Sequence, residues 1–209
     1  MAKARRADAM NTVRVLERST AAALLALVPT TAFAHSAKNM HGGFLAGFEH
    51  PFTGPDHLLA MVSVGLWGAF LGRPLLVALP VIFPAVMAVG ALLAMVGAPQ
   101  PPLEIGIALS VLVLGGAIAT AWRAPVWAAS LIVAVFALFH GYAHGMEIPS
   151  LADPIAYSTG FMLATGSLHL AGIGLGTTNT LQGGWRITRG IGMGIALAGV
   201  YFLSVAIFG

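Results

Sequence analysis

The sequence predicts an all-α integral membrane protein, a bundle of six transmembrane helices that follows a cleaved signal peptide. Three observations lead to this prediction. Of the 209 residues, 58% are hydrophobic and 8% are charged, whereas soluble domains have roughly 25% charged residues. Six apolar segments are each close to the roughly 20 residues that a membrane-spanning helix needs. Proline and glycine residues separate these segments, as expected for the connections between helices.

Residues 1–34 have the three parts of a secretory signal peptide. A basic region precedes the apolar run Ala21–Val28, and the small-residue pattern Ala32–Ala34 follows it. The formal charge of +3 belongs to this segment, because positive and negative charges cancel over 35–209. The charge therefore gives no indication of a nucleic-acid partner. We expect cleavage after Ala34 and one domain over 35–209; the alternatives are an uncleaved first helix and a start at Met10.

The apolar segments cover 56–72, 75–97, 103–122, 125–145, 154–175 and 189–208. Within 35–209, arginines lie only in alternate connections or at their edges: Arg73, Arg123, Arg186 and Arg189. The positive-inside rule places these connections in the cytoplasm. An even number of helices then puts both mature termini on the extracytoplasmic side of a bacterial inner membrane, as signal cleavage also requires. Glycines spaced four apart (Gly141/Gly145, Gly172/Gly176 and Gly190/Gly194) indicate close helix packing; the sequence leaves open whether the chain forms a homo-oligomer.

A first group of ionisable residues lies at the start of the first apolar segment, within His50–His57 (HPFTGPDH). Ionisable groups at membrane depth are costly and usually mark a substrate or ion pathway. We expect the prolines and the glycine to fold the backbone back and to bring His50 near Asp56 and His57, as first ligands of a transition metal. The alternative is a capping box, with Thr53 as N-cap and Asp56 reaching back to it. That alternative explains Asp56 but neither histidine.

A second group lies within Phe139–Glu147 (FHGYAHGME). His140, His144 and Glu147 are spaced four and three apart, so they share one face of a helix in an arrangement suited to a metal. The alternative is a pair of histidines hydrogen-bonded between helices, with Glu147 in solvent. His169, midway along the fifth segment, is either a deeper ligand or a polar group bonded across helices.

Several site classes are excluded by what the sequence lacks. It has no cysteine, which excludes disulfides, iron–sulfur clusters and thiolate ligands. It also has no GxxxxGK[ST] loop, so we expect no ATP hydrolysis by this chain. By the inferred topology, both histidine groups lie toward the extracytoplasmic side, as does Glu104, which we interpret as a helix-start acid. His169 lies deeper, which suggests a route inward.

The two groups resemble the motifs of the HupE/UreJ hydrogenase and urease accessory proteins. His50-x5-Asp56-His57 resembles the first-helix motif of that family, and Phe139-His140-Gly141-x-Ala143-His144-Gly145-x-Glu147 resembles the second. The cleaved signal and the six helices are also similar. This resemblance implies a nickel permease that supplies hydrogenase or urease maturation. Ni²⁺, or Co²⁺, is then the transported substrate, and no prosthetic group is expected.

A secondary permease would have two partners, the divalent metal ion and the lipid bilayer. Two other classes of function compete with this prediction. One is an intramembrane zinc-dependent hydrolase, in which a His/Asp site activates water. Against it, the sequence has neither HExxH nor GxSG, and Ser167 near His169 is the single hint. The other is a haem protein with two histidine ligands. We therefore expect a transporter and not an enzyme.

Overall fold

The computed structural model describes residues 43–147 and 153–209, which are helical almost throughout. The signal peptide and its cleavage after Ala34 lie outside the described residues. The described elements, in chain order, are α2 (Phe44–Thr53), α3 (Pro55–Leu71), α4 (Leu75–Met95), α5 (Leu103–Ala119), α6 (Val126–Glu147), α7 (Pro154–Gly176), the short 3₁₀ helix η1 (Thr177–Thr180) and α8 (Gly184–Phe208). The all-helical prediction is confirmed.

Helices α3 to α8 match the six predicted segments, whereas α2 was not predicted. Pro51, expected in a turn, lies inside α2, and the chain turns only at Gly54. The capping box is also wrong. Gly54 is the N-cap of α3, and the Thr53 hydroxyl donates back to the His50 carbonyl at 2.7 Å. Asp56 Oδ1 instead accepts the His57 backbone N–H at 2.8 Å.

The helices are those of a multi-pass membrane protein. Helices α4, α6 and α8 are long and apolar enough to cross a membrane. Helices α3 and α5 are apolar and have 17 residues each, at the lower end of the spanning range of about 17–25. Helix α7 has 23 residues. The count of six spanning helices stays a prediction.

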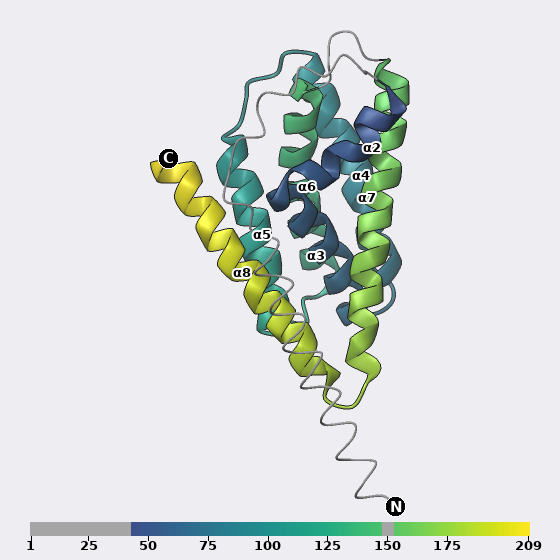
Figure 1. Ribbon diagram of the computed structural model, residues 1–209, viewed down its shortest axis with the longest axis vertical. Helices are drawn as coiled ribbons and strands as arrows, with labels where there is room; N and C mark the ends of the chain where they lie inside the picture. Colours follow the sequence, from purple (N-terminus) through teal and green to yellow (C-terminus); the bar gives the residue numbers. More distant parts are fainter. Residues whose placement is uncertain (1–42, 148–152) are drawn as a thin grey trace, which may run out of the picture.

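Three helix pairs build the bundle: α4 with α6, α5 with α8, and α3 with α7. Helix α3 lies in the centre, and α2 packs on α7 in the half of the bundle that holds the end of α6 (Figure 1). A Cβ at Gly141 would collide with the Met87 backbone of α4, and one at Gly65 would collide with the His169 carbonyl of α7. The predicted packing role therefore holds for Gly141, but Gly190 faces open space.

Charge separates along the bundle axis. At one end, the Arg123 guanidinium lies 5.2 Å from the Phe70 ring centroid. There too, Arg189 Nε donates to the Ala119 carbonyl at 2.7 Å, at the end of α5. The arginine-bearing connections are thus neighbours. The acidic residues belong to the opposite half, which holds α2, the starts of α3, α5 and α7 and the end of α6: Glu49, Asp56, Glu104, Glu147 and Asp153.

Candidate metal site

The two groups of ionisable residues meet between α2, α3 and α6. His144, one turn before the end of α6, lies at the centre of the cluster. Its ring centroid is 5.0 Å from that of His50 on α2 and 4.7 Å from that of His57 on α3. The outer cluster, as we call it, consists of His50, Asp56, His57, His140, His144 and Glu147. The helix α2 that the sequence interpretation missed is the element that holds His50 in place.

Three members of the outer cluster form a compact donor set near the surface. The donor atoms of His50, His144 and Glu147 all lie within 4.8 Å of one another. Glu147 Oε2 is 3.0 Å from His50 Nε2 and 3.4 Å from His144 Nδ1. An ion with bonds of about 2.1 Å needs donors roughly 3.0–3.4 Å apart, so both of these pairs fit one coordination shell. The Glu147 side chain is 38% exposed and that of His144 is 6% exposed, so the set opens to solvent on the Glu147 side.

Deeper in the cluster, His57 and His140 are oriented by hydrogen bonds. His57 Nδ1 lies 2.9 Å from Asp56 Oδ1, and His140 Nδ1 lies 2.9 Å from the Phe136 carbonyl. Each bond assigns the ring proton to Nδ1 and leaves the lone pair on Nε2. Both Nε2 atoms are buried and have no hydrogen-bond partner within the described part of the chain. Carboxylate and carbonyl groups commonly orient metal-binding histidines in this way.

His169 does not join the outer cluster. The Phe83 ring on α4 packs against both His169 and His140, with its centroid 5.4 Å from that of each histidine. Both ring nitrogens of His169 are buried and have no partner at hydrogen-bond geometry among the described residues. The Ser167 hydroxyl donates to the Ala164 carbonyl at 2.6 Å, so it does not form the serine–histidine pair that would hint at a hydrolase. Glu104 lies exposed in the first turn of α5, as a helix-start acid does.

Three aromatic residues at the site were missed by the sequence interpretation: Phe83, Phe161 and Tyr157, whose ring centroid is 6.0 Å from that of His50. Phe83 packs against His140 and His169, as described above. The Phe161 ring on α7 lies 4.2 Å from the His144 ring and 5.9 Å from the His50 ring, between centroids. Neither phenylalanine could be distinguished in the sequence from ordinary apolar residues of a membrane helix.

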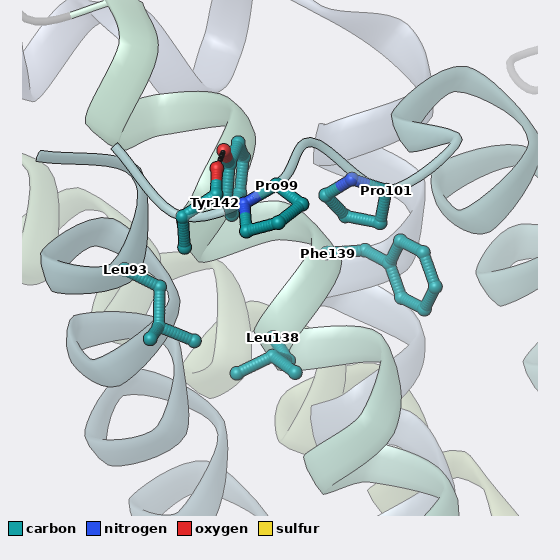
Figure 2. Close-up of a pocket in the computed structure, with 7 residues that line it drawn as sticks. Leu93, Pro99, Pro101, Leu138, Phe139 and Tyr142 are labelled. Atoms are coloured by element: carbon teal, nitrogen blue, oxygen red, sulfur yellow. Dashed lines mark hydrogen bonds between the residues drawn. The ribbon is translucent and has the colours of Figure 1, made fainter. Parts of the chain in front are cut away.

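A cavity of about 220 Å³ lies elsewhere, between α4, α6 and the connection that follows α4. Figure 2 shows Phe139 beside Pro101, and Tyr142 beside Pro99. The Tyr142 hydroxyl donates to the Ala98 carbonyl. The lining contains no histidine or carboxylate, so this cavity is not the metal site.

The fold and the cluster define a multi-pass α-helical membrane protein with histidines and carboxylates gathered between its helices. The family described as "HupE / UreJ protein" matches residues 23–202, and the chain belongs to this family. Protein HupE of Rhizobium leguminosarum bv. viciae is 40% identical over 180 residues, which cover 86% of this chain and 94% of that protein. No solved structure matches the chain. The family indicated by the two motifs is thus confirmed.

Proposed function

We propose that the protein is a secondary permease that carries Ni²⁺ from the extracytoplasmic side into the cytoplasm, for the maturation of a hydrogenase or urease. Membership of the HupE/UreJ family supports a transporter of nickel and not an enzyme. Co²⁺ is the second candidate ion. Imidazole and carboxylate donors suit either ion, and equilibrium affinity alone would favour Cu²⁺.

The observation that carries this proposal is the convergence of the two motifs. His50 and Glu147 are 97 positions apart in sequence, yet their donor atoms are 3.0 Å apart. Beside them, His57 and His140 present unpartnered Nε2 atoms, within the described residues, to the interior. A helical bundle that buries such groups loses stability unless they serve a ligand. Capture of a cation at this end of the bundle explains the arrangement.

The orientation proposed for the bundle places this cluster outside and the arginines in the cytoplasm. Fusions of a compartment-specific reporter at Gly72 and Gly184 should then report the cytoplasm. Fusions at Gln100 and Ser150 should report the extracytoplasmic side, and the mature protein should begin at His35. The reverse fusion pattern would contradict the proposed direction of transport.

Transport needs no ATP under this proposal. A dication that moves inward gains about 4.6 kcal/mol across 100 mV, which supports on the order of a thousandfold accumulation. Radioactive Ni²⁺ uptake in cells that express the protein, with Co²⁺, Zn²⁺ and Cu²⁺ as competitors, tests it. We expect Ni²⁺ accumulation that an uncoupler abolishes. Uptake equal to that of cells without the protein, or uptake that survives loss of the membrane potential, would contradict the proposal.

A further inference from the structure

We propose that His169, Thr165 and the backbone carbonyl of Pro80 form a second, interior ion-binding site, separate from the outer cluster. The occupant is the divalent ion after it leaves His140, so the inference rests on the proposed transport function. Three observations point to this interior site: unpartnered polar groups on α7, a broken hydrogen-bond ladder in α4, and the place of His169 outside the donor set of the outer cluster.

The first observation is a pair of unsatisfied polar side chains. Thr165 and His169 lie one turn apart on α7 and are 0% and 1% exposed. Their hydroxyl and both ring nitrogens have no hydrogen-bond partner in the described part of the chain. Other buried hydroxyls behave differently: those of Ser63 and Ser110 bond to carbonyls of their own helices at 2.6 Å. Buried polar groups are nearly always hydrogen-bonded, so this pair requires an explanation.

The second observation concerns the two prolines of α4, Pro80 and Pro84. Proline has no N–H, so Pro84 cannot bond the carbonyl four residues earlier, which is that of Pro80. The His169 ring packs edge-to-face on Phe83, three residues after Pro80, with 5.4 Å between the ring centroids, so it lies beside this part of α4. Carbonyls released at broken helices coordinate ions at the midplane of several transporters. An imidazole nitrogen, a hydroxyl and a carbonyl oxygen can therefore converge on one ion here.

The third observation separates this group from the outer cluster. The Phe83 side chain is 0% exposed and packs edge-to-face against both His140 and His169. Donors of one coordination shell lie roughly 3.0–3.4 Å apart. Among the described residues, His169 also belongs to no group of three histidines or carboxylates whose donor atoms lie within 4.8 Å of one another, so it stands apart from the donor set of the outer cluster. Phe83 lies between Pro80 and Pro84, so the backbone around this ring lacks two of the N–H donors of a regular helix.

The donors of the interior site are all neutral. A dication gains no charge neutralisation there, so binding is weaker than at the carboxylate-bearing outer cluster. This ordering suits a site from which the ion is released toward the cytoplasm, because conduction requires that an ion also be able to leave.

Thr165→Val tests the site, because it keeps the shape of the side chain and removes the hydroxyl. The full-length protein is reconstituted in liposomes, and Ni²⁺ entry is followed with a lumenal metal-sensitive dye. We expect uptake to fall about tenfold in Thr165→Val and to recover in Thr165→Ser. The matched control is Thr188→Val, at a buried threonine whose hydroxyl lies 3.4 Å from the Gly184 carbonyl of its own helix; we expect it to transport normally.

Two further measurements separate an ion site from a structural role. His169→Ala should bind one equivalent of Ni²⁺ fewer than the wild-type protein at equilibrium. The melting temperature of Thr165→Val should stay equal or rise, because the removed hydroxyl has no partner in the described residues. Normal uptake by Thr165→Val, or unchanged stoichiometry in His169→Ala, overturns the interior site alone. Wild-type protein that binds Ni²⁺ but does not transport it overturns the proposed function. In that case, the number of Ni²⁺ ions bound by His169→Ala and by the wild-type protein still decides whether the interior site exists.

Discussion

The outer cluster and the interior site differ in charge and in exposure. The outer cluster combines four histidines with two carboxylates, and the side chains of Glu147 and Asp56 are 38% and 25% exposed. The interior site has one histidine, a hydroxyl and a carbonyl, and its two side chains are almost completely buried. In the proposed pathway, fixed negative charge therefore lies where the ion would lose its water and is absent where the ion would be released. The comparison suggests that the outer cluster captures the ion and that the interior site passes it on.

The two regions also differ in how firmly their histidines are held. His57 and His140 are each oriented by an acceptor at 2.9 Å. His144 and His169 have no hydrogen-bond partner on either ring nitrogen within the described residues. The outer cluster therefore combines oriented rings with an unpartnered ring, whereas the proposed interior site has an unpartnered ring alone.

The largest effect is expected at His144, because it contacts both motifs of the outer cluster. His144→Ala removes the central donor, so Ni²⁺ uptake should fall to the background of cells without the protein. The amount of protein in the membrane should stay nearly unchanged. Uptake of radioactive Ni²⁺ and immunoblotting of membranes measure the two quantities. If the variant disappears from the membrane, His144 holds helices together and is not a ligand.

A smaller loss is expected at Asp56, which orients His57. Loss of a residue that orients a metal ligand typically costs 10–100-fold, so Asp56→Asn should lower uptake by about this factor. Asp56→Asn combined with His144→Ala should be little worse than His144→Ala, because residues of one site are strongly coupled. Equilibrium Ni²⁺ binding of both single variants and the double variant decides this, because uptake by His144→Ala is already expected at background. If the effects of the two substitutions simply add, Asp56 does not act as part of the same site as His144.

The smallest effect tests packing beneath the outer cluster. At Gly141 a methyl group would meet the Met87 backbone, whereas Gly166, beside Thr165, has no atom within 4 Å. Gly141→Ala should therefore lose about 1–3 kcal/mol of stability, as overpacked sites do. It should also lower uptake by displacing His140. Gly166→Ala is the matched control and should change neither quantity. Thermal unfolding in detergent measures stability, and equal unfolding of both variants would contradict the close approach of α4 and α6.

Hydropathy predicted the positions of the long helices but not all of their limits. Helix α8 begins at Gly184, five residues before the predicted start, because its first turn contains Trp185 and Arg186 and is helical without being apolar. Helix α2 was missed because Pro51 was interpreted as part of a turn. Proline lacks only its own N–H, and a helix of 10 residues can accommodate that loss near its end. Hydropathy reports on lipid contact, not on backbone hydrogen bonding.

The outer cluster was largely predictable because its members belong to two short motifs with helical spacing. The interior site was only partly predictable. His169 was noted as isolated, but its relation to Phe83 depends on how α4 and α7 cross, which no local pattern encodes. The spacing of Pro80 and Pro84 was visible in the sequence. It was a usable signal for a freed carbonyl at membrane depth.

The separation of charge along the bundle also determines how the protein responds to voltage. In the proposed orientation, a potential that is negative inside attracts the four arginines inward and repels the five carboxylates outward. Each charge contributes about 2.3 kcal/mol per 100 mV, so these nine charges together oppose inversion of the bundle by about 20 kcal/mol. The field that drives a cation inward thus holds the helices in their orientation. Under the proposed function, the electrical work would be done on the ion and would not invert the bundle around it.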